Sequence, residues 1–471
     1  MSPEPPTIAF DQGTLLLSGF SADGVAKIFP KIGWVLDNRV GRYRTDAIGY
    51  ADVDCALDQV AGKVTNDVVR WQKVAWSKNN LPTLRSQQLQ AVEAFLQAGN
   101  RGVVVMPTGT GKTVVALAIA QRLAVSCLFV APIRDLMYQW QRRIQEYLGY
   151  DVGIIGDNTF NVKPVSVTTY DSAAIHMTKL GNQFGLIVYD ECHHLPGDFY
   201  RESAIMSASP FRLGLTATPG RSDGRQTDLE NLIGKTIYEL QVHEATGDIL
   251  ADYRVIRVPV TLSSAEQIRY DQLSQQIRQY VYQRRQDDSQ FQWQELCRES
   301  NLDPQARAIL KAFRLKQSIE NRAEEKLRVL EDLFRLHVGE PTIVFVGSNA
   351  MARDVSIRFL VPCLLSHCGK KERQSLLSGF ESGSYPVIVA NQILDEGVDL
   401  PDAKVAIVIG GSSSTRQAKQ RLGRILRKSP FGGALLYEVV LAETSENLRS
   451  RARRRSDAFR KPQTSSSQKN T

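Results

Sequence analysis

The sequence lacks the features that mark exported and membrane-spanning proteins. No apolar run approaches eighteen residues, so no stretch is long enough to cross a bilayer as a helix. The first ten residues show no basic segment followed by an apolar one, so nothing indicates export. The six cysteines are scattered, mostly within apolar segments. They indicate reduced thiols, and we expect a cytoplasmic protein.

A zinc site is also poorly supported. Residues 192–194 (CHH) are adjacent in the chain and cannot easily converge on one ion, and no partner pair follows at ligand spacing. The same argument applies to Cys363, His367 and Cys368. The sequence therefore predicts no metal site formed by its histidines and cysteines.

Net charge is concentrated at one end of the chain. Residues 447–471 contain eight lysines and arginines and one aspartate, a net charge of +7 out of +8 for the whole sequence. The other 446 residues are thus close to neutral. The basic segment is interpreted either as a disordered tail that contacts phosphate backbones or as a merely solvating end.

The strongest local signal is the stretch 103–118 (VVVMPTGTGKTVVALA). Its apolar start predicts a buried strand, its glycines a loop, and Lys112 and Thr113 the first residues of a helix. This is the order of a P-loop, whose backbone N–H groups and helix N-terminus face phosphate. Lys112 then reaches the β- and γ-phosphates, and the Thr113 hydroxyl holds Mg²⁺. Met106 replaces the first glycine of the full pattern, and a simple glycine turn before a helix is the alternative.

A second signal follows residues 186–189, an apolar run that predicts another buried strand. Asp190 lies at the carboxyl tip of that strand, where an acid beside a P-loop strand holds Mg²⁺. Its neighbour Glu191 would orient and deprotonate the attacking water. A third, weaker signal follows the predicted strand 211–215. The hydroxyls of Thr216 and Thr218 can bond the carboxylates and transmit the state of the nucleotide.

Strands and helices alternate after residue 84 and again after about 326, which predicts two parallel, doubly wound α/β sheets. We expect the following division: an N-terminal α+β domain over 1–76, a first α/β domain over 81–250, a second over 251–445 with a helical insert at about 265–320, and a basic tail over 446–471. The N-terminal domain interleaves five tryptophans and tyrosines with arginines between residues 34 and 76. Such aromatics either stack on bases or fill a core.

The second sheet carries a basic segment, 417–427 (QAKQRLGRILR). Arg421, Arg424 and Arg427 are spaced by three and share one face of a helix. Like charges this close repel unless an anion lies opposite them. A triphosphate bound by the first sheet would be such an anion, with the arginines acting as fingers. A solvated basic face is the alternative.

Several segments in order resemble a superfamily 2 helicase with two RecA-like domains in tandem. They are residues 84–88, PTGTGKT, DECHH, LTATP, DEGVDLP and QRLGRILR. The runs YDECHHLPGDFY, PFRLGLTAT and ILDEGVDLPDA resemble the XPB family of repair and transcription helicases in its compact prokaryotic form. FDQGTLLLSG resembles the start of that family's damage-recognition domain, and the helical insert lies where the family has its thumb. The resemblance covers roughly residues 7–445.

The motifs and the resemblance together give a set of site residues. Nucleotide contacts are expected from Arg85, Gln88, Thr108, Gly109, Thr110, Gly111, Lys112, Thr113, Gly397 and Asp399, the first two at adenine. Mg²⁺ ligands are expected to be Thr113 and Asp190. Catalytic roles are expected for Lys112, Glu191, Arg424 and Arg427. Coupling of nucleotide to domain movement is expected from Thr216, Thr218, Gln420 and Arg421.

One motif departs from the family. The Arg-Glu-Asp motif that the family uses in strand opening is here Arg221, Ser222 and Asp223. Loss of the central carboxylate puts efficient unwinding in doubt, although it does not affect the residues for ATP hydrolysis.

The sequence therefore predicts an ATP- and Mg²⁺-dependent DNA helicase or translocase. The resemblance implies 3′-to-5′ polarity, a role in repair, single-stranded and forked DNA as partners, and a nuclease partner. Two alternatives remain: an RNA helicase, and an ATP-switched DNA clamp or translocase that opens little DNA.

Overall fold

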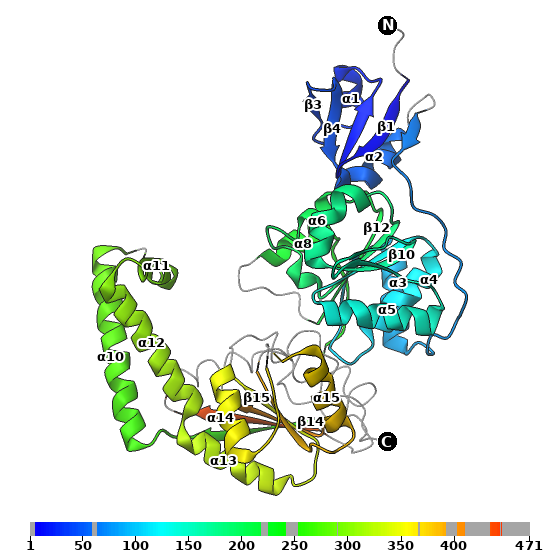
Figure 1. Ribbon diagram of the computed structural model, residues 1–471. Helices are drawn as coiled ribbons and strands as arrows, with labels where there is room; N and C mark the ends of the chain where they lie inside the picture. Colours follow the sequence, from blue (N-terminus) through cyan, green and yellow to red (C-terminus); the bar gives the residue numbers. More distant parts are fainter. Residues whose placement is uncertain are drawn as a thin grey trace, which may run out of the picture. The chain divides into compact units, whose positions relative to one another are not determined.

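The computed structural model describes residues 5–58, 64–217, 225–241, 253–289, 291–365, 368–391, 403–409, 434–442 and 444. The chain forms two compact units, Met1–Glu244 and Ala245–Thr471 (Figure 1). Within the described residues, no helix combines the length and the apolar character needed to span a membrane.

The first unit begins with a five-stranded sheet in the order β3-β4-β2-β1-β5. Its elements are β1 (Thr7–Asp11), β2 (Thr14–Ser18), α1 (Ala22–Ile28), β3 (Val35–Asp37), β4 (Arg42–Asp46), α2 (Tyr50–Leu57) and β5 (Thr65–Asp67). β1 and β2 form a hairpin around Gln12 and Gly13, which both have positive φ, as the turn requires. Ile8, Leu15 and Leu17 are fully buried in the core that the sheet shares with α1 and α2.

Of the five aromatic side chains between residues 34 and 76, Tyr50 is buried and the other four are half-buried, and Trp34, Tyr43 and Trp71 pack against the core of the small sheet. Three ring pairs are in contact with centroids 5.5–5.6 Å apart: Phe29–Trp34, Tyr50–Trp71 and Trp76–Tyr150. Among the arginines, Arg44 forms ion pairs with Asp11 (3.0 Å) and Asp37 (3.2 Å). Of the two interpretations of these aromatics, the structure supports core packing.

The larger part of the first unit is an eight-stranded sheet in the order β13-β6-β12-β11-β7-β10-β8-β9. Its strands are β6 (Arg101–Val105), β7 (Cys127–Ala131), β8 (Gly153–Gly156), β9 (Thr159–Phe160), β10 (Val165–Thr169), β11 (Leu186–Asp190), β12 (Phe211–Thr216) and β13 (Thr236–Glu239). Its helices are α3 (Ser86–Gln97), α4 (Lys112–Leu123), α5 (Arg134–Leu148), α6 (Tyr170–Leu180), α7 (Glu202–Ile205) and α8 (Asp228–Leu232). All of its strand pairs are parallel except β8 with β9. The predicted parallel sheet is confirmed.

Helices cover both faces of this sheet. Leu128 and Val130 of β7 belong to a core cluster with Met177 of α6, whereas Phe129 between them stacks on Trp140 of α5. Since successive side chains of a strand point to opposite faces, α5 and α6 lie on opposite sides. Figure 1 shows the same division, with α3, α4 and α5 grouped apart from α6 and α8.

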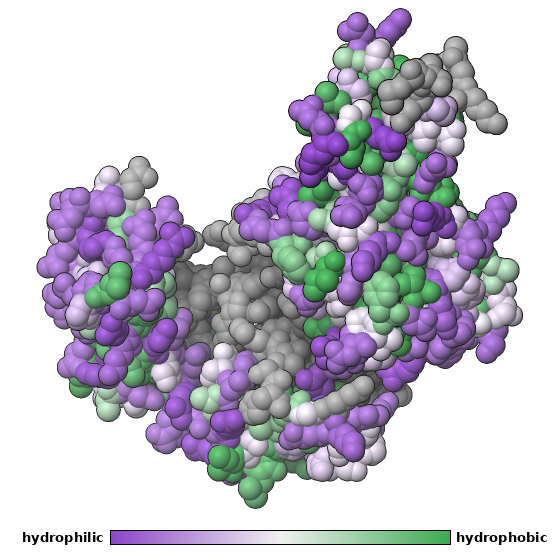
Figure 2. Space-filling view, turned by 45° about the horizontal axis from the view of Figure 1, so that its top comes forward, coloured by the Kyte–Doolittle hydropathy of each residue, from purple (hydrophilic) through white to green (hydrophobic). Residues whose placement is uncertain are grey.

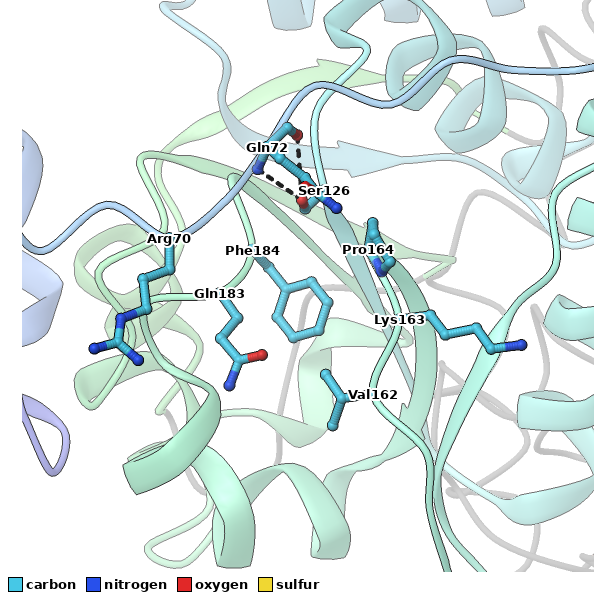
Figure 3. Close-up of a pocket in the computed structure, with 8 residues that line it drawn as sticks. All are labelled: Arg70, Gln72, Ser126, Val162, Lys163, Pro164, Gln183 and Phe184. Atoms are coloured by element: carbon cyan, nitrogen blue, oxygen red, sulfur yellow. Dashed lines mark hydrogen bonds between the residues drawn. The ribbon is translucent and has the colours of Figure 1, made fainter.

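Residues 68–80 connect the two sheets of the first unit along the amino ends of the parallel strands. Arg70 N–H donates to the Asn182 carbonyl (3.1 Å), and Gln72 N–H donates to the Ser126 hydroxyl (3.0 Å). A cavity of about 350 Å³ lies between this segment and the sheet (Figure 3). Its lining residues are Arg70, Gln72, Ser126, Val162, Lys163, Pro164, Gln183 and Phe184. It lies at the amino ends of the strands, so it is distinct from the P-loop, which follows the carboxyl end of β6.

The second unit contains a six-stranded sheet in the order β14-β19-β18-β15-β17-β16, with every pair parallel. Its strands are β14 (Tyr253–Val260), β15 (Thr342–Val346), β16 (Cys363–Leu364), β17 (Val387–Ala390), β18 (Val405–Ile409) and β19 (Ala434–Leu441). Helices α13 (Glu324–Leu336), α14 (Asn349–Phe359) and α15 (Lys370–Glu381) belong to the same unit. The prediction of a second parallel α/β sheet is confirmed.

The predicted helical insert consists of α10 (Ser264–Asp287), α11 (Trp293–Glu299) and α12 (Pro304–Arg322). α10 begins with a capping box in which Ser263 and Glu266 satisfy each other's backbone N–H groups. Tyr280, Leu296 and Ile309 form a small core between the three helices. The face of these helices seen in Figure 2 is mostly hydrophilic, as their composition predicts.

Candidate nucleotide site

The predicted P-loop has the expected local structure. β6 ends at Val105 and α4 begins at Lys112, and the loop between them contains Gly109 and Gly111 with φ of 86° and 89°. These left-handed angles are the reason for glycine at both positions. Gly111 is also the N-cap of α4 and has no side chain to satisfy the first N–H groups of the helix. Those groups are the phosphate donors of a P-loop.

Met106 fits the loop in place of the expected glycine. It is fully buried and has no positive φ, so a side chain is tolerated there. Its N–H donates to the Thr216 carbonyl (3.0 Å), which continues the β6–β12 pairing by one residue. Its carbonyl accepts a hydrogen bond from Lys112 Nζ (3.2 Å). The Lys112 side chain thus folds back over the P-loop, the loop at which it would also contact phosphate.

Gln88 lies in the first turn of α3, which begins at Ser86. The side chain is only 4% exposed. Its Oε1 accepts from Arg85 N–H (3.0 Å), and its Nε2 donates to the Thr110 carbonyl in the P-loop (2.8 Å). An amide has two donors and two acceptor positions, so an adenine contact remains available to Gln88. Thr110 is buried, and its hydroxyl donates to the Pro107 carbonyl (2.7 Å).

The sheet order brings the acidic pair to the P-loop. β12 lies between β6 and β11, with Thr216 paired to Val105 and Leu215 paired to Asp190. The carboxyl ends of these parallel strands therefore meet at one edge of the sheet. Glu191, which follows β11, has a φ of 48° and turns the chain sharply away from the strand.

Thr216 and His193 contact the predicted catalytic base. His193 Nδ1 lies 3.1 Å from Thr216 Oγ1 and 3.4 Å from Glu191 Oε2. The Thr216 hydroxyl lies 3.5 Å from the same carboxylate oxygen. The side chains of both His193 and Thr216 are fully buried. Of the two predicted carboxylates, Thr216 thus contacts Glu191, and His193 contacts both residues.

The two carboxyl groups differ in their surroundings. Burial raises the pKa of Asp190 above its usual range, and the neighbouring Glu191 carboxylate acts in the same direction. Burial also acts to raise the pKa of Glu191, but the Lys112 ammonium and a hydrogen bond from His193 outweigh it and lower that pKa. Lys112 also lowers the pKa of Asp190. The lysine is therefore electrostatically coupled to both acids.

Two residues of this region carry structural roles that the sequence did not indicate. Trp140 of α5 donates its indole N–H to Asp190 Oδ2 (2.9 Å). Arg212 of β12 is fully buried and donates to four backbone carbonyls, 2.6–3.1 Å away: Ala204, Ser207, Ser209 and Leu232. Burial lowers the pKa of Arg212 to about 10, which leaves it charged at neutral pH. A tryptophan at an apolar helix position, or an arginine within a strand, gives no signal of such contacts.

The residues of this edge fit a magnesium–nucleotide complex. Thr108 Oγ1 is buried and has no hydrogen-bond partner among the described residues. The start of α4 offers backbone donors, and Lys112 a cation, to phosphate. Asp190 and Thr113 carry side-chain oxygens, the kind of ligand that Mg²⁺ prefers. The remaining predicted site residues lie outside the described part of the chain: Thr218, Arg221, Asp223, Gly397, Asp399, Gln420, Arg421, Arg424 and Arg427.

Two parts of the chain match known protein families. Residues 81–221 match the family described as "Type III restriction enzyme, res subunit". Residues 325–429 match the "Helicase conserved C-terminal domain" family.

Several curated proteins are similar over most of the chain. The DNA 3′-5′ translocase XPB2 of Sulfurisphaera tokodaii is 41% identical over 376 residues, which cover 79% of this chain and 84% of that protein. The DNA 3′-5′ helicase XPB of Kineococcus radiotolerans is 32% identical, over 77% of this chain and 60% of that protein. The corresponding Mycobacterium tuberculosis protein is 27% identical, over 92% and 70%. The chain thus spans well over half the length of each relative.

Among solved structures, Saccharomyces cerevisiae Dbp5 bound to RNA and ADP BeF3 has a similar fold. The TM-score is 0.53 at 17% sequence identity, and the match covers 79% of this chain and 87% of that one. At this identity the likeness concerns the fold alone.

Proposed function

This chain belongs to the XPB family of DNA helicases, and on that basis we propose that its first α/β sheet carries the ATP-hydrolysing centre of a 3′-to-5′ DNA translocase or helicase. The observation that carries this proposal is the strand order, in which only β12 lies between β6 and β11, so that the P-loop and the acids Asp190 and Glu191 follow the same edge of the sheet. The names of the similar proteins support DNA as the substrate.

Each residue at this edge has a definite task in that reaction. The N–H groups at the start of α4 and the Lys112 ammonium bind the phosphates and neutralise charge that develops during transfer. Thr113 and Asp190 hold Mg²⁺, which when bound withdraws charge from the phosphate oxygens. Glu191, ionised because Lys112 and His193 lower its pKa, orients the attacking water and accepts its proton. Arg85 and Gln88 contact adenine.

The second unit supplies the remaining residues in this proposal. Arg424 and Arg427 act as arginine fingers on the transferring phosphate, while Gly397, Asp399, Gln420 and Arg421 couple nucleotide to domain movement. Thr216 and Thr218 pass the state of the nucleotide to the neighbouring domain. Alternating grip on one DNA strand then converts each cycle into a step.

The cellular role is proposed at a broader level. The protein acts in the cytoplasm on single-stranded and forked DNA during repair, together with a nuclease. Arg221 and Asp223 contribute to strand opening, and Ser222 between them makes the protein a stronger translocase than unwinding enzyme. RNA is less well supported than DNA as the substrate, because the structural likeness to an RNA-bound protein extends only to the fold.

The test is steady-state ATP hydrolysis without nucleic acid and with single-stranded DNA, forked DNA or RNA. We expect DNA to stimulate hydrolysis, Lys112→Ala to abolish it, and Glu191→Gln to bind ATP without turning it over. Normal turnover by Glu191→Gln would contradict the assignment of the base. Equal rates with and without DNA would favour an ATP-switched clamp.

A further inference from the structure

The carboxylate of Asp190 is bonded at both oxygens. Trp140 Nε1–H donates to Oδ2 (2.9 Å), and the Glu191 backbone N–H donates to Oδ1 (3.1 Å). The Asp190 backbone carbonyl accepts from the Tyr170 hydroxyl (3.0 Å). One donor on each oxygen fixes the rotation of the carboxylate and leaves lone pairs for a further ligand.

Trp140 is placed by the packing of α5. The buried residues of this helix follow a helical spacing: Leu136, Met137, Trp140, Ile144 and Leu148. Trp140 is 3% exposed, and its ring stacks on Phe129 of β7 with centroids 4.9 Å apart and planes at 29°. A tryptophan has two side-chain torsions, and burial between helix and sheet fixes both. Its N–H is therefore a rigid donor.

The strand pattern explains why this donor meets Asp190. Phe129 pairs with Val188 in the sheet, and their side chains face α5. Asp190 is two residues beyond Val188, so its side chain points to the same face. Trp140 spans the distance from Phe129 to the strand end. The buried indole N–H donates to the Asp190 carboxylate and not to a backbone carbonyl. The packing of α5 on the sheet therefore acts directly on the position of this acid.

We propose that Trp140 is a positioning residue that holds the Asp190 carboxylate in the orientation in which it binds the divalent metal. The inference rests on the proposed function, in which Asp190 is a metal ligand. Partners that orient a metal ligand commonly change metal affinity by about 10- to 100-fold when they are lost. The shape of Trp140 keeps α5 on the sheet, whereas its N–H sets the metal affinity.

The experiment separates the N–H from the ring. Trp140 is replaced by phenylalanine and, by incorporation of an unnatural residue, by 3-(3-benzothienyl)alanine, which has sulfur in place of the N–H and nearly the same shape. Trp76→Phe is the matched control, because Trp76 packs on Tyr150 and its Nε1 has no hydrogen-bond partner among the described residues. Mn²⁺ binding to the ADP complex is measured by electron paramagnetic resonance, beside metal-free ADP binding.

We expect both Trp140 variants to need about ten times more Mn²⁺ for half saturation. Metal-free ADP affinity and the Trp76→Phe protein should be unchanged. If Trp140→Phe fails to fold, the benzothienyl protein, with the ring shape retained, decides the question. An unchanged Mn²⁺ affinity in that protein overturns the proposal.

Asp190→Asn distinguishes this failure from failure of the proposed function. If Asp190→Asn weakens Mn²⁺ binding and the benzothienyl protein does not, the metal assignment stands and the role of Trp140 is rejected. If Asp190→Asn also binds Mn²⁺ normally, Asp190 is not a ligand, and both proposals fail.

Discussion

His193 and Thr216 share a hydrogen bond, with Nδ1 and Oγ1 3.1 Å apart, that joins the residues after β11 to the last residue of β12. Both side chains are fully buried, and both lie within 3.5 Å of Glu191 Oε2. The Thr216 backbone carbonyl also accepts a hydrogen bond from the N–H of Met106, the first residue of the P-loop. A single threonine thus contacts the P-loop and the predicted base.

Replacement of this threonine by valine should impair coupling more than nucleotide binding. Thr216→Val keeps the shape of the side chain and removes the hydroxyl. We expect the affinity for ATP to stay within about threefold of that of the unmodified protein. DNA-stimulated hydrolysis and movement along the strand should fall at least about tenfold, because the variant loses roughly one charge-assisted hydrogen bond. Triplex displacement measures the movement. Thr168→Val is the control, because Thr168 is equally buried in the same sheet but its hydroxyl donates to the Ile155 carbonyl.

A methyl group at Gly111 should block the P-loop. A Cβ there would lie 2.3 Å from Gln88 Nε2, at a φ of 89° that disfavours any side chain. Strain of about 1–2 kcal/mol and the displaced Gln88 should weaken ATP binding by at least about tenfold. Gly99→Ala is the matched control, since Gly99 also has a positive φ (73°) but an added Cβ meets nothing within 4 Å. Binding of a fluorescent ATP analogue to the two proteins gives the comparison, and equal affinities would refute the argument.

Arg212 should be essential for the stability of the first unit. A lysine has one nitrogen and cannot reach the four carbonyls that the guanidinium contacts, so Arg212→Lys leaves buried acceptors unpaired. We expect a loss of at least about 3 kcal/mol, which lowers the melting temperature by roughly 6–12 °C for a unit of this size. Arg39→Lys, at an arginine whose side chain is 83% exposed, should leave the melting curve of the full chain nearly unchanged. A shift below 2 °C for Arg212→Lys would contradict the prediction.

The second unit should lose stability at acid pH through Glu340. Hydrogen bonding by Lys404 lowers the pKa of Glu340 against the effect of burial, with help from His337, whose Nδ1 is 2.7 Å from the carboxylate. Because the folded pKa is below the unfolded one, this stabilisation is present at neutral pH and is lost as the pH falls through the acid range. Glu340→Gln should therefore cost about 1 kcal/mol at pH 7 and progressively less below the ordinary glutamate pKa. Urea unfolding of both proteins across that range measures the difference, and a pH-independent difference would exclude this origin.

Strands and their order along the chain could be predicted because buried parallel strands read as short apolar runs. β7, β15, β17 and β18 begin and end where the runs do. The proximity of Lys112 and Asp190 could be predicted as well, because the carboxyl ends of parallel strands lie at the same edge of the sheet. Short elements with weak patterns, such as β3, β9 and β16, were not predicted.

Contacts between distant elements could not be predicted in the same way. The indole of Trp140 and its acceptor are 50 residues apart, and the helix pattern of α5 indicates only that the ring is buried. Arg212 is the only charged residue of β12 (FRLGLT), where an arginine first suggests an exposed position.

The order of strands in the eight-stranded sheet has a consequence for synthesis on the ribosome. β6 is the first strand of that sheet to be translated, yet its neighbours β12 and β13 are the last two. At about 5–20 residues per second, roughly 7–27 seconds pass between Val105 and Glu239 leaving the peptidyl-transferase centre. Until Thr216 has also been added, the P-loop strand has neither of its neighbours in the sheet, and the second neighbour is complete only at Glu239. Nucleotide can therefore bind only to a nearly complete first unit, and it cannot assist the earlier folding of the nascent chain.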